Sequence, residues 1–209
     1  MSALVPSPPE DKINCVRERC YNVLALFALP ILGAVAAIRQ PGLNQLVRLA
    51  VLAACNILFV AHLGILQRRL ALQTAKPVRL GPGAVLAAVA LAGFFFISPP
   101  LFVVGLILTA IVGVQSHSSI NPAPPPLASF LVLFSGAALY FIGGYLTFSH
   151  PTAAGFAVAL CLGAALAAGC HWSGNSGNHP HPFRRVGRGL YPALAAALLL
   201  WRSWTWWWW

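Results

Sequence analysis

The sequence has 209 residues, of which 59% are hydrophobic and only 8% are charged, and its mean hydropathy is +0.78. A soluble domain of this length does not bury so many apolar side chains, so we expect a membrane protein. The net charge of +10 would suit nucleic acid, but the basic residues stand at the ends of apolar runs rather than in dense patches, and we expect no nucleic-acid partner.

The chain starts with a polar arm, residues 1–20, which is too small to fold as a domain. Residues 21–209 are expected to form a single transmembrane helical domain. The first apolar run of this domain covers residues 21–38 and carries Pro30 at its middle. Proline removes one helical hydrogen bond, here to the Leu26 carbonyl, so we expect a kink.

The second apolar run, residues 49–67, has the length that a helix needs to cross a hydrocarbon core of about 30 Å. It contains Asn56 and His62, whose polar groups cost free energy in lipid unless they face protein or water. His62 also belongs to a set of residues spaced by seven, which is nearly two helical turns and therefore forms one stripe along the helix. The members of this stripe are Arg48, Cys55, His62 and Arg69. We expect the stripe to point into a helix bundle.

Two short apolar runs follow, residues 83–98 and 101–115, with two prolines between them. Both are short for a full crossing, so they predict either two thin spans joined by a tight turn or a re-entrant pair. Residues 127–149 and 152–170 predict two further crossing helices. The second of these carries small residues four apart, which let helix backbones approach closely. These pairs are Gly155/Ala159, Gly163/Ala167 and Ala165/Gly169.

The last part of the chain is predicted to be a polar loop, residues 171–189, and then a final span that begins with residues 190–200. Six tryptophans stand among the last nine residues. Tryptophan prefers the membrane interface, where its ring is in apolar surroundings and its N–H stays hydrated. We interpret this segment as an interfacial anchor, with packing against a neighbouring subunit or a pigment as the alternative.

Seven crossings place ten basic residues on the side of the N-terminus and three on the opposite side, whereas six crossings give eight against five. The positive-inside rule favours the stronger bias. We therefore expect an all-α bundle of about seven spans, with six plus a re-entrant pair as the alternative, and an N-terminus on the cytosolic, matrix or stromal side. The basic residues expected to contact anionic lipid headgroups are Arg68, Arg69, Lys76, Arg79, Arg184, Arg185 and Arg188.

Histidine is the residue type in this sequence that is best suited to bind a ligand. Neutral imidazole ligates haem or chlorophyll, and neighbouring arginines can pair with haem propionates. One hypothesis is that His62 holds a tetrapyrrole, with His171 or His117 as the second ligand. The alternative is that His62 makes a hydrogen bond across helices and the others lie at the interface. No metal site is predicted, because His179 and His181 have no cysteine or acid nearby and the cysteines lack zinc spacing.

Acidic residues are confined to the first twenty positions, and no aspartate, glutamate, lysine or arginine lies between Arg79 and Arg184. Proton transport through carboxylates, carboxylate-bound magnesium chemistry and intramembrane aspartyl catalysis all need an acid in or near the membrane, so these classes are largely excluded. A serine–histidine site would also lack the acid that orients the imidazole. We expect no catalytic residues and no enzyme activity.

Few polar groups in the spans, small-residue packing faces and polar termini favour a non-catalytic accessory subunit of a larger membrane protein complex. Its location is expected to be an energy-converting organelle, in the mitochondrial or plastid inner membrane. Two alternatives stay open: a small-solute transporter or channel lined by Asn56 and His62, and a haem- or chlorophyll-binding subunit that uses His62. Apart from that pigment no cofactor is predicted. The expected partners are membrane lipids and other integral membrane subunits.

Overall fold

The computed structural model describes residues 24–71, 81–117, 126–171 and 182–207, which form helices and short turns without any strand. In chain order these are the N-terminal helix, described over Leu24–Ala37, and then α2 (Leu43–Ala71), α3 (Pro82–Ile97), α4 (Pro99–His117), α5 (Pro126–Leu146), α6 (Ala153–His171) and α7 (Pro182–Trp207). The prediction of an all-α fold is therefore confirmed for the described residues. The polar arm, residues 1–20, lies outside them.

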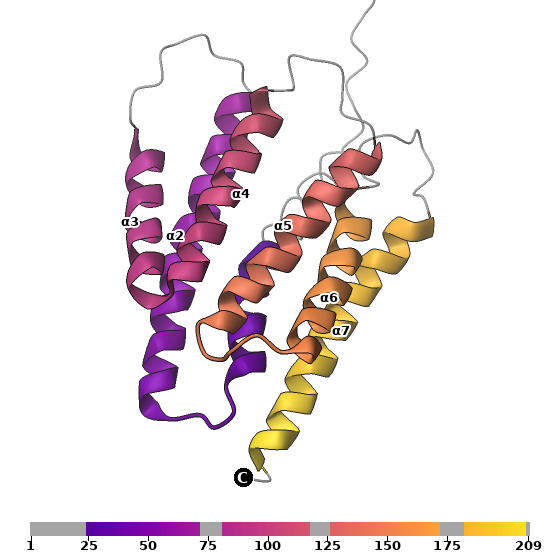
Figure 1. The fold of residues 1–209 in the computed structure, drawn as a ribbon. Coiled ribbons are helices and arrows are strands. Elements are labelled where there is room, and N and C mark those ends of the chain that lie inside the picture. The colour runs from indigo at the N-terminus through magenta and orange to yellow at the C-terminus, as the bar shows by residue number, and fades with distance from the viewer. Residues whose placement is uncertain (1–23, 72–80, 118–125, 172–181, 208–209) are drawn as a thin grey trace, which may run out of the picture.

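The helices run alternately up and down in Figure 1. Helices α2, α3 and α4 pack on one another, α5 packs on α6 and α6 on α7, and the contact between α4 and α5 joins the two groups. The N-terminal helix also links these groups. It packs against α5 at Gly33, and its backbone carbonyls accept hydrogen bonds from side chains of α2 and α7.

The turn between α3 and α4 consists of Ser98 alone. Its N–H donates a hydrogen bond of 2.7 Å to the Phe94 carbonyl oxygen and closes the last turn of α3. Pro99 then opens α4, where the missing N–H of proline is not needed. The two short apolar runs therefore form a helical hairpin with a tight turn, and both expectations, two thin spans or a re-entrant pair, stay predictions.

The turn between α5 and α6 is organised by Thr152. Its hydroxyl oxygen accepts a hydrogen bond of 3.1 Å from the Gly155 N–H and so caps the first turn of α6. The Tyr145 hydroxyl at the end of α5 lies 2.9 Å from the same oxygen. This contact fixes the two helix ends relative to each other.

Two of the described helices are long and apolar enough to cross a membrane, by length and composition, namely Leu43–Ile65 within α2 and Ala153–Cys170 within α6. Shorter apolar stretches occur in the N-terminal helix, α3, α4 and α5. These findings are weak evidence for membrane association. The number of crossings stays a prediction.

The structure differs from the sequence-based expectation in α7 and in α2. The predicted polar loop at residues 171–189 is wrong in its second half, because α7 begins at Pro182. Proline suits the first turn of a helix, and this start was not recognised in the sequence. In α2, Cys55 and His62 are buried as the predicted stripe requires, but Arg48 is exposed. The first turns of α2 extend beyond the end of α3 in Figure 1.

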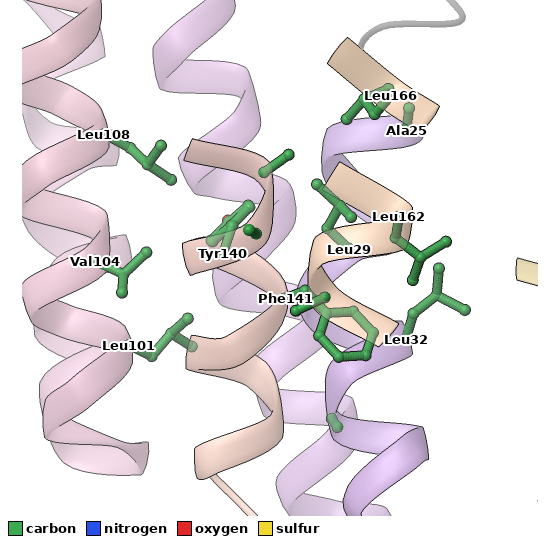
Figure 2. Close-up of a cluster of buried hydrophobic side chains, with 14 of the residues drawn as sticks. Ala25, Leu29, Leu32, Leu101, Val104, Leu108, Tyr140, Phe141, Leu162 and Leu166 are labelled. Carbon is green, nitrogen blue, oxygen red and sulfur yellow. The ribbon is translucent and has the colours of Figure 1, made fainter. Parts of the chain in front are cut away.

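Aromatic side chains of α2, α3 and α5 form the centre of the core. Phe59 of α2 is fully buried, and its ring centroid lies 5.5 Å from that of Phe94 and 5.9 Å from that of Tyr140. Figure 2 shows the adjoining layer, where Phe141 of α5 lies near Leu29 of the N-terminal helix and apolar side chains of α4 point toward α5. Tilted aromatic pairs of this kind contribute about 0.5–1.5 kcal/mol each beyond their buried area.

A close helix crossing joins α5 to the N-terminal helix. A Cβ atom at Gly144 would overlap the Pro30 carbonyl oxygen and come within 2.6 Å of the Pro30 Cα. A Cβ atom at Gly33, almost one turn along the N-terminal helix, would overlap the Phe141 carbonyl oxygen. Two glycines on facing helices therefore allow the backbones to touch.

The small residues of α6 pack against two different helices, α5 and α7. A Cβ atom at Gly163 would lie 3.0 Å from the Phe134 carbonyl oxygen of α5. The Ala165 and Gly169 backbones face Gly187 of α7, where a Cβ atom would come within 2.8 Å of the Ala165 carbonyl oxygen. The predicted packing role of this helix is confirmed at these positions.

Candidate functional site

His62 lies in the C-terminal half of α2, beside the start of α3. Its side chain is only 8% exposed, and its Nδ1 lies 2.8 Å from the Gly83 carbonyl oxygen in the first turn of α3. A carbonyl oxygen only accepts hydrogen bonds, so Nδ1 carries the proton and donates it. This hydrogen bond selects the tautomer, orients the ring and ties α2 to α3.

The second ring nitrogen of His62, Nε2, is buried and has no hydrogen-bond partner among the described residues. With the proton on Nδ1, Nε2 presents a lone pair that can accept a hydrogen bond or bind a metal. A buried polar atom without a partner costs about 1–3 kcal/mol. The nearest described ring is apolar, since the Phe59 centroid lies 6.5 Å from the imidazole centroid.

Asn56 is the second polar residue in α2, and its side chain is fully buried. Its Nδ2 donates a hydrogen bond of 2.6 Å to the Phe27 carbonyl oxygen of the N-terminal helix. Its Oδ1 accepts a hydrogen bond from the Tyr140 hydroxyl of α5, which is also fully buried. One side chain therefore connects three helices through what we call the Asn56 junction, formed by Asn56, Phe27 and Tyr140.

The Asn56 junction lies close to the position where Pro30 interrupts the hydrogen bonding of the N-terminal helix. Pro30 leaves the Leu26 carbonyl without its helical partner. The carbonyl oxygens on either side of it accept hydrogen bonds from side chains of other helices. The Tyr191 hydroxyl of α7 donates to the Ala25 carbonyl oxygen over 2.9 Å, and the Asn56 Nδ2 of α2 donates to the Phe27 carbonyl oxygen. Polar side chains of two helices therefore support this part of the backbone.

The three predicted histidine ligands stand on three different helices. His62 is on α2, His117 is the last residue of α4, and His171 is the last residue of α6. The side chains of His117 and His171 lie outside the described residues, so their role as second ligand stays a prediction. Helices α2 and α4 are in contact, whereas α2 and α6 are not, within the part of the chain that the structure describes.

The basic residues predicted to contact lipid headgroups lie near the ends of α2 and α7, or outside the described residues. Arg68 and Arg69 are in the last turns of α2, and Arg184 and Arg185 are in the first turn of α7. Figure 1 shows these two helix ends at the same end of the bundle. Two further predicted residues, Lys76 and Arg79, lie outside the described residues. The last member, Arg188, packs on α6, where a Cβ atom at Gly169 would lie 3.4 Å from its Cγ.

The tryptophan-rich segment is helical to Trp207, and one side of it contacts the N-terminal helix. The Arg202 guanidinium donates hydrogen bonds to the Val35 carbonyl oxygen, over 3.3 Å, and to the Ile38 carbonyl oxygen. The Trp206 Nε1 also donates to the Ile38 carbonyl, over 3.1 Å. The carbonyls in the last turn of a helix lack helical partners and carry partial negative charge, so a cation and an indole N–H are suitable caps.

The sequence analysis missed this cap and missed Tyr140. A tyrosine inside an apolar run is a local signal of a buried hydrogen bond, by the same argument that singled out Asn56. The cap had no such signal, because Arg202 and Val35 are 167 residues apart in the chain.

Replacing Arg202 with alanine is expected to loosen the last turn of the N-terminal helix and to lower the free energy of unfolding by about 1 kcal/mol, since two charge-assisted hydrogen bonds are lost at a partly exposed site. Hydrogen–deuterium exchange should rise at residues 35–38 and stay unchanged in α3. Ser203→Ala is the matched control, because the exposed Ser203 hydroxyl donates only within its own helix, to the Leu200 carbonyl. Equal exchange in both variants would contradict the capping role.

No group of three or more histidine, cysteine, aspartate or glutamate side chains that suits a metal ion occurs among the described residues. Comparisons with protein-family models, with curated proteins and with solved structures find no match to this chain.

Proposed function

We propose that this chain is a multi-pass integral membrane protein and a non-catalytic accessory subunit of a larger membrane complex. The observation that carries the proposal is the distribution of side chains in the bundle. Large apolar groups cover its outside, and the polar groups of its interior bond mainly to one another and to the backbone.

Exposed apolar side chains occur on every described helix, and several are almost fully accessible, such as Phe96 at 84% and Trp207 at 89%. One example from each helix in chain order is Leu24, Leu43, Phe96, Val103, Leu131, Phe156 and Leu200. In water such a surface would lead to association, because monomeric soluble proteins expose only limited apolar patches. Lipid and neighbouring apolar helices both remove this penalty.

The lengths of the shorter helices support a crossing role for them as well. Helix α3 has 16 residues and α4 has 19, which correspond to about 24 and 28 Å at 1.5 Å per residue. Helix α5 has 21 residues, or about 31 Å. The lengths of α4 and α5 lie near the thickness of a hydrocarbon core of about 30 Å, whereas α3 would need a locally thinner bilayer to cross it. Together with the alternating directions in Figure 1, they support seven crossings.

The distribution of basic residues supports an N-terminus on the cytosolic, matrix or stromal side. The ends of α2 and α7 that carry Arg68, Arg69, Arg184 and Arg185 point the same way in Figure 1, where anionic headgroups would meet them. Arg202 lies near the opposite end of α7. An inner membrane of a mitochondrion or plastid is the location that we favour for such a subunit.

The Asn56 junction argues for a packed scaffold rather than a transport path. Both ends of the Asn56 amide are used in hydrogen bonds between helices, and Tyr140 is fully buried beside it. The transporter alternative required this amide to line a path for solute. Its hydrogen bonds instead stabilise the arrangement of three helices.

Membrane fractionation followed by gentle solubilisation tests the proposal. After washing with alkaline carbonate, the chain is expected to remain in the membrane pellet and to be released only by detergent, since helices that cross a bilayer resist such extraction. In a mild detergent it is expected to migrate on native gels well above the mass of its 22.2 kDa chain and to co-purify with other integral membrane proteins.

The two parts of this proposal fail separately. Recovery of the chain in the supernatant without detergent would contradict membrane insertion. Recovery from the membrane only as a monomer, with no co-purifying protein, would contradict the accessory role and leave the location intact.

A further inference from the structure

We propose that one anionic phospholipid binds where the N-terminal helix meets α7, with its phosphate on Arg39 and Arg202 and an acyl chain in a groove between α5 and α6. The inference rests on the membrane insertion proposed above and does not need the accessory role. It concerns the end of the bundle that carries few basic residues, so a general positive surface charge does not account for it.

Two arginines come together at the C-terminal end of the N-terminal helix. The Arg202 guanidinium donates a hydrogen bond to the Ile38 carbonyl oxygen, and Arg39 is the residue that follows Ile38. The like charges of Arg39 and Arg202 act on each other, whereas Arg48 of α2 has no such effect on Arg202. Aspartate and glutamate are absent from every part of the chain that the structure describes, so no acidic side chain there offsets the pair. Two neighbouring cations without an acidic partner attract an anion.

Both arginines keep hydrogen-bond donors for this anion. A guanidinium has five N–H donors, and Arg202 uses two of them within the described residues, at the Val35 and Ile38 carbonyl oxygens. The Arg39 side chain is exposed and makes no hydrogen bond to another described residue. Phosphate oxygens accept paired hydrogen bonds from the planar fork of a guanidinium, so the chemistry of the pair suits a phosphate group.

A shallow groove between the end of α5 and the start of α6 offers a place for an acyl chain. It contains about 180 Å³ of space and is open on one side. Apolar side chains line it together with Tyr145 and Thr152, and the largest of them are Ile142, Leu146 and Phe156. The Tyr145 hydroxyl is occupied by its contact with the Thr152 hydroxyl, at 2.9 Å, so the groove presents an apolar surface.

Tyr145 places this groove close to the arginine pair. Its backbone contacts the N-terminal helix, because a Cβ atom at Gly33 would lie 2.9 Å from the Tyr145 nitrogen. Gly33 precedes Ile38, whose carbonyl oxygen Arg202 caps, by about one and a half helical turns. Tyr145 and Arg202 also interact electrostatically. Figure 1 shows the turn between α5 and α6, the end of the N-terminal helix and the C-terminal half of α7 at the same, lower end of the bundle.

A phospholipid fits these features better than a free anion does. The Trp201 ring centroid lies 5.7 Å from the Arg202 Cζ, and the Trp206 Nε1 donates to the Ile38 carbonyl oxygen. Tryptophans are typical of the membrane interface, which is the depth of lipid phosphates. A free anion would use the arginines and leave the apolar groove empty, whereas a phospholipid uses both.

The test is native mass spectrometry of the full-length protein in detergent, titrated with phosphatidylglycerol and, separately, with phosphatidylcholine of the same acyl chains. A third titration uses glycerophosphoglycerol, which has the phosphatidylglycerol headgroup without its acyl chains. The decisive variant is Arg39→Gln, because Arg39 is exposed and takes no part in the cap of the N-terminal helix. Arg48→Gln is the matched control, since it removes the same charge from an exposed arginine that does not act on Arg202.

We expect the wild-type protein to retain one phosphatidylglycerol per chain and to bind it at least about fivefold more tightly than phosphatidylcholine. Arg39→Gln should weaken phosphatidylglycerol binding by about fivefold and leave the Tm and phosphatidylcholine binding unchanged, while Arg48→Gln should match the wild type. Glycerophosphoglycerol should show no saturable binding. Phosphatidylglycerol with a photoreactive acyl chain should crosslink to the wild-type protein within residues 142–156, and this readout does not depend on any variant.

Equal affinity for the two lipids, unchanged binding by Arg39→Gln, an equal loss in Arg48→Gln, or crosslinks confined to other residues would each overturn the proposal. Binding of glycerophosphoglycerol as tight as that of the lipid would assign the site to a free anion and overturn it as well. These outcomes leave the proposed membrane insertion intact, because insertion is tested by the carbonate wash and not by lipid selectivity.

Discussion

Replacing Gly144 with alanine is expected to lower the free energy of unfolding by about 3 kcal/mol, the upper part of the usual range for overpacked sites. The added Cβ atom would overlap the Pro30 carbonyl oxygen and lie within 2.6 Å of the Pro30 Cα. Both neighbours are backbone atoms of a helix, which cannot rotate away as a side chain can, so α5 and the N-terminal helix must separate. The separation would also open the contact between Gly33 and Phe141.

Thermal unfolding in detergent measures this effect, and a loss of about 3 kcal/mol corresponds to a Tm lower by roughly 6–12 °C for a chain of this size. Gly64→Ala is the matched control on a helix, because no atom lies within 4 Å of its Cβ position. Alanine favours a helix over glycine by up to about 1 kcal/mol, so this control should melt at or above the wild-type temperature. A Gly144→Ala protein with the wild-type Tm would show that the two backbones do not touch.

The second large effect is expected at Asn56. Asn56→Leu replaces the amide with an apolar side chain of similar shape and removes the acceptor for the fully buried Tyr140 hydroxyl and the donor to the Phe27 carbonyl oxygen. The unpaired hydroxyl costs about 1–3 kcal/mol, so we expect a loss of about 2 kcal/mol in the free energy of unfolding. The Phe27 carbonyl contributes less to this loss, because the helical partner of that carbonyl is retained.

A double-mutant cycle with Tyr140→Phe isolates the hydrogen bond within the Asn56 junction. The Tyr140→Phe change alone should cost about 1 kcal/mol, between the average of about 0.6 kcal/mol and the maximum of about 1.7 kcal/mol that double-mutant cycles give for hydrogen bonds between membrane helices. The double variant should lose less than the sum of the two single variants, by about 1 kcal/mol, because the same hydrogen bond is removed in each. Strictly additive losses would contradict the contact between these two side chains.

The positions of the helices were largely predictable because their signals are local. Apolar runs bounded by prolines and polar residues anticipated α3 to within a residue at each end, with α3 observed over Pro82–Ile97, and anticipated α6, observed over Ala153–His171. The start of α7 at Pro182 was missed, since the basic residues of its first turns were interpreted as a loop. Charge on one helical turn does not by itself distinguish a loop from the end of a helix that extends past the bundle.

Only one half of the candidate site, the polar side chains of α2, could be predicted from local signals in the sequence. Asn56 and His62 stood out because a polar side chain inside an apolar run is visible in the sequence. Their partners were not visible, because Tyr140 and Gly83 belong to other helices and only packing brings them near. The predicted stripe held at Cys55 and His62, which are buried, and failed at Arg48, which is exposed.

The amino-acid sequence by itself determined that the chain is helical, where most of its helices lie, and that acidic chemistry is absent from its apolar part, because composition and the order of residues along the chain decide these properties. The tertiary structure alone decided which nitrogen of His62 carries the proton, which glycines touch another backbone, and which helix end Arg202 caps. Each of these depends on contacts between residues far apart in the chain. Their distances are set by how the helices pack, and no local pattern of residues records that packing.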